Sequence, residues 1–328
     1  MPSFDAIGLG ALNVDRIYVV PRVVTDGAEL IQESTAAAGG SSANTVYGLA
    51  KLGLRCGFIG AVGGQDAEMV LGSFAEVGVD TSRIVSKAGA GTATVFAFAD
   101  PMGRRAMYVY PGANALFAAG DVDASYLADG RLLVISSFDG EVPLAVQKAA
   151  VGALPKTTLL ALLLDALWAQ ARLDALSELV ARSTIVFANA DELAELTDRG
   201  LPAAAEALLA VGCRTVIVTF GGGTERPPWM ETEPQGMADA PIVCWIASAE
   251  GQWALAAHPT HEGAVVDATG AGDAFATGFL WAYLSGGSPL HCASLGHVTA
   301  GFCLEQMGCR AGLPTREALL TRHARHFP

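Results

Sequence analysis

The sequence contains few positive charges for its length. Lysine and arginine number 20 against 33 aspartate and glutamate residues, which gives the 328-residue chain a formal net charge of −13. Binding to nucleic acid depends on clusters of basic side chains, so we predict that the protein has no nucleic-acid partner. The acidity indicates a well-solvated surface. An anionic ligand would need a local positive site, such as a helix N-terminus or a metal ion.

Paired cysteines and targeting segments are also missing. The first five residues lack the basic region and apolar run of a secretory signal. No uninterrupted apolar run reaches the ~18 residues that a membrane helix needs. The six cysteines form no CxxC pair; they are Cys56, Cys213, Cys244, Cys292, Cys303 and Cys309. We therefore expect a cytoplasmic protein with reduced thiols and no membrane association.

Several common catalytic motifs do not occur. The chain has neither the GxxxxGK[ST] loop of a P-loop kinase nor the GxSxG elbow of a hydrolase. Residues 8–13 lack the third glycine of a dinucleotide fingerprint, and strand-like residues follow them. Two histidines and two cysteines near the C-terminus recur every six positions, a spacing that turns them apart on a helix, so we predict no shared metal. These residues are His291, His297, Cys303 and Cys309.

Short apolar runs alternate with segments long enough to hold helices. Hydrophobic residues make up 52% of the chain and charged residues 16%, which is typical of a compact protein with a large core. The apolar runs cover residues 4–12, 56–62, 132–136, 159–164, 184–188 and 215–219. Strands alternating with helices predict a mostly parallel sheet with helices on both faces. In such folds the ligand lies at the carboxyl edge of the strands.

A hairpin, four helices and one long loop complete this outline. Residues 92–99 and 105–110 predict a β-hairpin around the turn sequence Asp-Pro-Met-Gly. Apolar residues at helical spacing predict helices over residues 42–52, 65–77, 271–284 and 289–306. The stretch 221–241 is rich in Gly, Pro and Glu and predicts an exposed loop. The sequence assigns no role to residues 224–243.

A glycine-rich turn leads directly into the helix predicted from Ala271. In the segment Asp267-Ala268-Thr269-Gly270-Ala271-Gly272-Asp273, the first backbone N–H groups and the positive end of the helix dipole make an anion site. The Asp273 carboxylate can accept a proton from a hydroxyl group that attacks a phosphorus atom. The short string leaves one alternative open, an ordinary helix N-terminus with a favourable acidic residue.

Four other polar residues suit a hydroxylated ligand and its phosphate donor. Asp15 and Asn44 can bind hydroxyl groups, or can simply be a turn residue and a first-turn helix residue. Asn189 and Glu192 suit Mg²⁺, a hard ion that keeps several water ligands. The same spacing, N-x-x-E, also forms a helix capping box. The residue types leave both interpretations open for each pair.

Together these segments resemble the ribokinase-like, or PfkB, carbohydrate kinase family. Residues 267–273 resemble its C-terminal signature, roughly D-T-x-G-A-G-D, with Ala268 in place of the commoner threonine. The N-terminal signature is similar to Gly39-Gly40-Ser41-Ser42-Ala43-Asn44. Further segments that fit the family are 57–63, 78–81 and 111–114, so the resemblance extends from about Ile7 to Pro314.

The resemblance implies a fold, an activity and partners. The expected fold is α/β, a ribokinase-like three-layer fold with a mostly parallel central sheet and a small β lid. The chain would be a single kinase domain over residues 1–328, with lid segments within about 12–35 and 90–115. Such a protein uses ATP and Mg²⁺ to phosphorylate a hydroxyl group of a sugar or sugar derivative. Pairing through the lids would make a homodimer.

The resemblance also implies a role for each matching residue. Asp273 matches the general base, and the anion hole is matched by Gly270, Ala271 and Gly272. Substrate-binding positions are matched by Asn13, Asp15, Gly39, Gly40 and Asn44. Positions near the nucleotide phosphates, Mg²⁺ or the base are matched by Asn189, Glu192, Thr219, Gly221 and His297. Asp267 and Thr269 match positions that hold a monovalent cation, K⁺, in some members.

Two alternatives and three departures accompany this interpretation. The same signatures suit a nucleoside kinase, adenosine-like in its substrate, and a non-catalytic relative that senses a sugar or nucleoside. The turn at Gly221 lacks the last glycine of the family pattern, residues 226–241 have no counterpart, and His297 replaces an asparagine that is common near the nucleotide base. These departures concern nucleotide binding and leave Asp273 untouched.

Overall fold

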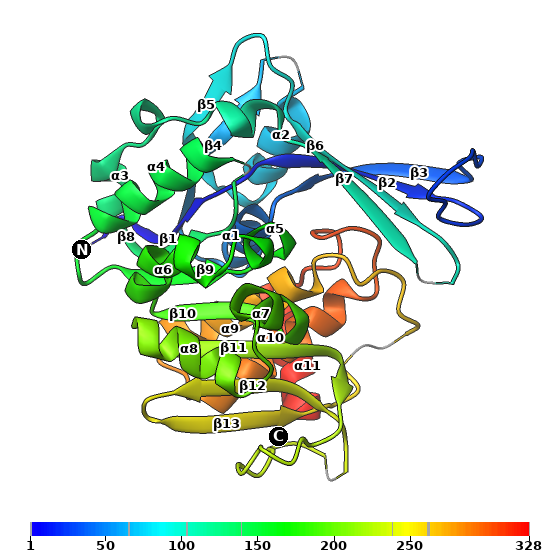
Figure 1. Ribbon diagram of the computed structural model, residues 1–328, viewed down its shortest axis with the longest axis vertical. Coiled ribbons are helices and arrows are strands. Elements are labelled where there is room, and N and C mark those ends of the chain that lie inside the picture. The colour runs from blue at the N-terminus through cyan, green and yellow to red at the C-terminus, as the bar shows by residue number, and fades with distance from the viewer. Residues whose placement is uncertain are drawn as a thin grey trace.

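The strands of the protein form two separate sheets, of nine and four strands (Figure 1). The structure is a computed structural model that describes residues 2–64, 66–102, 104–138, 140–237, 239–260 and 263–327. The large sheet has the order β13-β12-β11-β10-β9-β8-β1-β4-β5. Its strands are β1 (Phe4–Leu9), β4 (Cys56–Gly63), β5 (Asp80–Lys87), β8 (Gly130–Ile135), β9 (Leu159–Leu163), β10 (Ile185–Asn189), β11 (Thr215–Thr224), β12 (Ile242–Ser248) and β13 (Gly251–Ala256). Pairing is parallel from β5 to β11 and antiparallel at β12 and β13, which confirms the predicted mostly parallel sheet.

Alternate residues of the central strands face two different hydrophobic cores. In β8, Leu132 and Val134 belong to one core, whereas Leu133 and Ile135 belong to the other. All four side chains are fully buried. A strand that is covered on both faces needs a continuous apolar run. This requirement explains why the sequence revealed these strands as short apolar runs.

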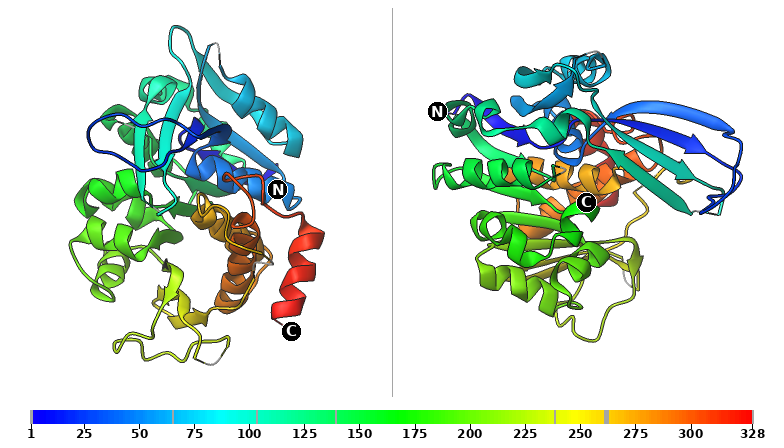
Figure 2. Two further views of the ribbon diagram at one scale, coloured as in Figure 1. Left: turned by 90° about the vertical axis from the view of Figure 1, so that its right-hand side faces the viewer. Right: turned by 45° about the horizontal axis from the view of Figure 1, so that its top comes forward.

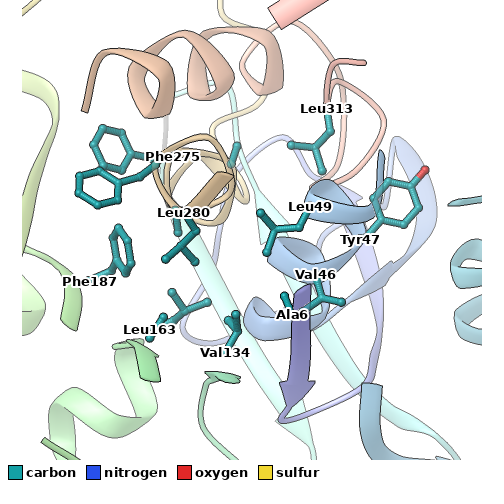
Figure 3. Close-up of a cluster of buried hydrophobic side chains, with 14 of the residues drawn as sticks. Ala6, Val46, Tyr47, Leu49, Val134, Leu163, Phe187, Phe275, Leu280 and Leu313 are labelled. Atoms are coloured by element: carbon teal, nitrogen blue, oxygen red, sulfur yellow. The ribbon is translucent and has the colours of Figure 1, made fainter. Parts of the chain in front are cut away.

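One face of the large sheet is covered by helices from both ends of the chain. These helices are α1 (Ser41–Lys51), α2 (Glu68–Val77), α9 (Ala271–Leu284), α10 (Pro289–Cys303) and α11 (Arg316–His326). Figure 3 shows Val46 and Leu49 of α1 in the same cluster as Phe275 and Leu280 of α9. Phe187 of β10 packs edge-on against α9 from the sheet. This packing fixes α1 and α9 to each other and to the sheet.

The second core lies under the helices of the middle of the chain. They are α3 (Ala124–Ala128), α4 (Glu141–Gly152), α5 (Ala166–Gln170), α6 (Leu173–Arg182), α7 (Ala190–Thr197) and α8 (Ala203–Val211), with two short 3₁₀ helices at Gly112–Leu116 and Ala119–Asp121. Helices therefore cover both faces of the sheet, as predicted, and make the three layers of the expected fold.

The four-stranded sheet projects from one side of the main body (Figures 1 and 2). Its order is β3-β2-β6-β7, made of β2 (Asn13–Val19), β3 (Glu33–Gly39), β6 (Ala93–Ala99) and β7 (Arg105–Tyr110). We call this sheet the lid. β3 continues to Gly39, beyond the limit of residue 35 set for the first lid segment. Its sequence, ESTAAAG, has one β-branched residue and no aromatic one, so it carried little strand signal.

Other predicted elements can be compared directly with the structure. The hairpin of β6 and β7 is confirmed, with Gly103 of its turn outside the described residues. Helix α9 has the predicted bounds, α10 ends three residues early, and α2 begins at Glu68 rather than at residue 65. Strands β5, β12 and β13 were not predicted. In the part of the chain that the structure describes, no helix has both the length and the apolar character to cross a membrane.

The loop between β11 and β12 is partly packed rather than exposed throughout. The ring of Trp229 lies 4.9 Å from that of Trp245 in β12, and Met230 is buried. Arg226 fastens the loop to itself by donating to the Glu233 carboxylate and to two main-chain carbonyls. The prediction of an exposed loop is therefore wrong for the segment around Trp229.

Candidate active site

The N-terminus of α9 is built for close approach of a ligand. Gly270 precedes the helix in the left-handed conformation, with φ of 78°, and a Cβ there would lie 2.7 Å from the Cβ of Cys309. Only glycine satisfies both conditions. No side chain caps the helix, and among the described residues the amides of Gly272 and Asp273 have no hydrogen-bond acceptor. These amides and the helix dipole offer an anion a binding site.

Asp273 joins the N-termini of α9 and α1. Ser41 Oγ donates to Asp273 Oδ1 at 2.6 Å, and Asn44 Nδ2 donates to Oδ2 at 2.9 Å. The main-chain carbonyl of Asp273 accepts from Thr277 Oγ1 at 2.8 Å. The carboxylate is thus held in one orientation, one residue away from the exposed amide of Gly272. The structure places Asp273 and the predicted anion hole side by side.

Burial makes Asp273 a stronger base than an ordinary carboxylate. Desolvation raises its pKa to about 6, against the opposing effect of hydrogen bonds from Ser41 and Asn44. Asp165 raises the pKa further, and Arg310 lowers it. At neutral pH the group is therefore mostly ionised, and its affinity for a proton is close to what a general base needs.

Asp15 reaches the same region from the lid. It lies on β2, and a Cβ on Gly39 would fall 2.2 Å from Asp15 Oδ2, so this approach requires glycine at position 39. Gly40 has φ of 103°, and its Cβ would meet the carbonyl of Ala11 at 2.1 Å. Burial raises the pKa of Asp15 to about 6, and the nearby charge of Asp273 contributes to the increase.

Asn13 and Asn44 complete the polar side of this region. Asn13 Oδ1 accepts from Asn114 Nδ2 at 3.0 Å, and Asn114 Oδ1 accepts from the amide of Leu12 at 3.3 Å. Asn114 is fully buried and was not identified from the sequence as a site residue. Of the predicted substrate-binding set, Asp15, Gly39 and Asn44 come together: Gly39 lies against the Asp15 carboxylate, and Arg310 donates to the Asn44 amide oxygen and to the Gly39 carbonyl.

Asn189 and Glu192 form the capping box that was one of their two interpretations. Glu192 N donates to Asn189 Oδ1, and Asn189 N donates to Glu192 Oε2, both at 2.8 Å. Asn189 also lies opposite Thr219 in the ladder between β10 and β11. Burial raises the pKa of Glu192 to about 7, with contributions from Asp165 and Asp273. These capping bonds do not exclude a role at the site, because the oxygen atoms of both side chains can accept further hydrogen bonds.

Asp165 is a further carboxylate of this region that was not identified from the sequence. It follows β9 at the carboxyl edge of the sheet, caps α5, and accepts from Ser137 Oγ at 2.6 Å. Burial raises its pKa, and its charge in turn raises the pKa values of Asp273 and Glu192. Three carboxylates therefore influence one another here. The only sequence signal was the position of Asp165 directly after an apolar run.

Asp267 and Thr269 shape the turn before the anion site. Asp267 Oδ1 accepts from Thr269 N at 2.9 Å and from Thr269 Oγ1 at 2.7 Å, and Oδ2 accepts from Gly308 N at 3.0 Å. Arg105 of the lid strand β7 also reaches Asp267, at 3.5 Å. Protein donors thus occupy both carboxylate oxygens. A monovalent cation at this turn would depend chiefly on main-chain carbonyls.

His297 and Gly221 are two residues predicted to lie near the nucleotide. His297 Nε2 lies 2.9 Å from the carbonyl oxygen of His258 and accepts from its amide at 3.2 Å, which ties α10 to the segment after β13. Gly221 is exposed and adopts φ of 54°. The nucleotide contacts expected of His297, Gly221 and Thr219 stay predictions.

The N-terminus of α9 has no side-chain cap and lies beside the fixed carboxylate of Asp273, whose pKa is raised. This arrangement suits phosphoryl transfer to a hydroxyl group. The sequence matches the pfkB family carbohydrate kinase profile over residues 5–223 and 244–316. The chain therefore belongs to this family and is a small-molecule kinase with an alcohol group as acceptor. The match omits residues 224–243, the stretch that contains the loop around Trp229.

Individual relatives agree with the family assignment. The chain is 30% identical over 272 residues to an uncharacterised sugar kinase of Archaeoglobus fulgidus, covering 81% of this chain and 98% of that one. The nucleoside kinase of Methanocaldococcus jannaschii has a similar fold, with a TM-score of 0.80, 20% identity and coverage of 99% and 100%. The ribokinase of Arabidopsis thaliana, solved with ribose and ATP, has a TM-score of 0.78, 19% identity and coverage of 98% of both chains. These structures confirm the ribokinase-like fold.

The raised pKa of Asp273 predicts how its removal affects stability. Because the folded-state pKa of about 6 exceeds the unfolded value of 3.8, the folded state loses stability relative to the unfolded state as the pH rises from about 4 to 6. Asp273→Asn should therefore increase the free energy of unfolding at pH 7 to 8, by an amount on the order of 1 kcal/mol. Urea denaturation across pH 4 to 8 measures this difference. A difference that grows as the pH falls would contradict the assignment.

Proposed function

We propose that the protein transfers the γ-phosphoryl group of ATP to a hydroxyl of a sugar or sugar derivative, with Asp273 as the general base. The observation that carries this proposal is the position of the Asp273 carboxylate, fixed by Ser41 and Asn44 beside the unbonded amides at the start of α9. A module that only bound a ligand would not need a half-buried carboxylate with a raised pKa at an anion site.

The reaction follows from these positions. The substrate hydroxyl oxygen forms a bond to the γ-phosphorus, the bond from that phosphorus to the β–γ bridging oxygen breaks, and ADP leaves. Asp273 accepts the hydroxyl proton, and the amides of Gly272 and Asp273 stabilise the negative charge of the transferring group, whereas the amide of Ala271 donates to the carbonyl of Ala268. Asp273 has to be ionised at the start, which its pKa of about 6 permits at neutral pH.

The carboxylates of Asp165 and Glu192 suit Mg²⁺. Burial raises the pKa of both, the charge of Asp165 raises the pKa of Glu192 further, and among the described residues neither carboxylate forms an ion pair with a lysine or arginine. Hard oxygen ligands of this kind bind Mg²⁺, often through water. When bound with ATP, the ion neutralises phosphate charge. Asn189, beside Glu192, would contribute to the same site, and Asp267 and Thr269 to a K⁺ site through main-chain oxygens.

The substrate region combines polar anchors with an apolar lid surface. Asp15, Asn13 and Asn44 supply the carboxylate and amide groups that bind sugar hydroxyls. The ladder partners of Asp15, which share its face of the lid, are Ala37 and Val95, and Val109 follows on β7. This apolar surface beside Asp15 supports a nucleoside as a second candidate substrate, since a base needs an apolar cover.

A panel of acceptors tests the reaction and the substrate class together. ADP release should appear with at least one sugar or nucleoside, and Asp273→Asn should lower kcat by about 10³-fold or more while substrate binding persists. Glu317→Gln is the matched control, because Glu317 is an exposed carboxylate in the first turn of α11. Ligands that stabilise the protein without any ADP release would support a sensor instead. Unchanged turnover in Asp273→Asn would disprove the role of the base.

The pKa of Asp273 also predicts the pH dependence of turnover. The ionised base is lost as the pH falls through about 6, so kcat/KM should decrease tenfold per pH unit below that value. A profile measured from pH 4.5 to 8.5 on the best acceptor checks this. An acid limb centred near pH 4 would show that the base is an ordinary exposed carboxylate.

The lid has a surface suited to a second copy of the chain. β7 is an edge strand, and four consecutive large side chains on it are exposed: Met107, Tyr108, Val109 and Tyr110. Exposed apolar edge strands promote pairing between chains. We propose a homodimer through the lids, in keeping with the expectation from the family resemblance.

Mass measurement in solution tests this dimer. Tyr108→Lys should shift the protein from dimer to monomer in size-exclusion chromatography with light scattering, because the change places a charge on the edge strand. Val142→Lys is the control, since Val142 is similarly exposed but lies on α4. A wild-type monomer at micromolar concentration would refute the proposed dimer.

A further inference from the structure

Arg310 is a buried arginine in the loop between α10 and α11. Its side chain donates to three acceptors: from Nε to Asn44 Oδ1 at 2.9 Å, from Nη1 to Ser73 Oγ at 2.6 Å, and from Nη2 to the carbonyl of Gly39 at 3.4 Å. The guanidinium is 5.2 Å from the ring centre of Tyr47 and 5.0 Å from that of Phe74. Only 8% of the residue is exposed. These contacts leave the group a single orientation.

The bond from Arg310 determines which way the Asn44 amide points. A guanidinium N–H can only donate, so the amide oxygen of Asn44 has to face Arg310. The amide NH₂ group then faces Asp273 and donates to Oδ2 at 2.9 Å. In the opposite orientation, the amide oxygen would lie against the carboxylate and repel it. Arg310 thus acts on the base through Asn44, without touching the base.

The charge of Arg310 is also unusual for a buried arginine. Among the described residues, no carboxylate forms an ion pair with it, whereas the equally buried Arg322 pairs with Glu305 at 2.7 Å. A buried cation without a direct counter-ion is costly unless nearby charges balance it. Asp15 and Asp273, both in the proposed substrate region, are the carboxylates whose charges act on Arg310 most strongly.

We infer that Arg310 is a positioning residue for the reaction, one that orients the Asn44 amide toward Asp273 and balances the charges of Asp15 and Asp273. This inference rests on the proposed role of Asp273 as the base. It adds a function for a residue outside both signature segments. Arg310 itself would contact neither the acceptor nor ATP, because its bonds are made to Asn44, Ser73 and Gly39.

The titratable groups around this network support the same assignment. Burial raises the pKa of Asp15 and of Asp273 to about 6, and the charge of Arg310 holds both values lower than burial alone would. The other groups that act most strongly on these three residues are Asp165, Cys309 and Tyr47, and Lys51, Glu68 and Glu76 line the same pocket as Arg310. Removal of the positive charge should therefore make both carboxylates easier to protonate.

Two substitutions separate charge from orientation. Arg310→Gln removes the charge, and Arg310→Lys keeps it but loses the planar donor that holds Asn44. On the best acceptor of the panel, Arg310→Gln should lower kcat about tenfold or more, change KM by less than about threefold, and move the acid limb of the pH profile upward. Arg310→Lys should restore the acid limb but not the full kcat. In an Asn44→Ala background, Arg310→Gln should have little further effect.

The control is Arg322→Gln, which removes an equally buried arginine that contacts Phe302 and Glu305 instead. It should lower stability without moving the acid limb. If Arg310→Gln and Arg322→Gln reduce activity in parallel with unmoved acid limbs, then Arg310 is only structural and the inference is overturned. If Arg310→Gln does not fold, Arg310→Lys serves as the test, and a wild-type kcat in this variant would also overturn the inference.

A measurement without turnover keeps this inference separate from the proposed function. At pH 7 to 8, Asp273→Asn should stabilise the protein against urea more in the Arg310→Gln background than in the wild type, because the carboxylate then lacks its balancing charge. Equal stabilisation in both backgrounds would show that Arg310 does not act on Asp273. If no acceptor is phosphorylated but Asp273→Asn still stabilises the Arg310→Gln protein more than the wild type, the proposed activity is rejected. The effect of Arg310 on Asp273 is then retained.

Discussion

The site depends on the hydrogen bonds that Asp273 accepts from Ser41 and Asn44. Ser41 and Asn44 lie 232 and 229 residues before Asp273 in the sequence, and the bonds join the N-termini of two helices. A helix N-terminus attracts negative charge, and here two of them meet around one carboxylate. The shared apolar cluster beneath α1 and α9, with Val46 and Phe275, holds this arrangement in place. The fold thereby places a fixed carboxylate and two unbonded helix amides at one point of the sheet edge.

In this region, burial raises the pKa values of the carboxylates, whereas a nearby positive charge lowers them. Asp15, Asp165, Glu192 and Asp273 all have raised pKa values because they are removed from water. Arg310 offsets part of this effect on one side of the site. On the other side, among the described residues, no lysine or arginine forms an ion pair with Glu192 or Asp165.

The sequence predicted the parts of the site that are encoded locally. The turn at Gly270 and the first-turn carboxylate of Asp273 lie in one short string, and the apolar runs of the sheet are visible because both faces are buried. Arg310 was missed because its partner Asn44 is 266 residues away and no local pattern links the two. Strand β3 was missed because alanine and glycine dominate it, and β12 because it follows a long loop.

The two carboxylates that face the substrate region stand on different bodies of the molecule. Asp15 belongs to the lid, whereas Asp273 belongs to the helical layer on the large sheet. The negative charge of Asp273 raises the pKa of Asp15, an effect that weakens with distance. Any movement of the lid away from the main body would weaken this effect and expose Asp15 to water. The position of the lid therefore affects the proton affinity of Asp15. Opening of the lid would lower the pKa of Asp15 at the step in which a ligand leaves.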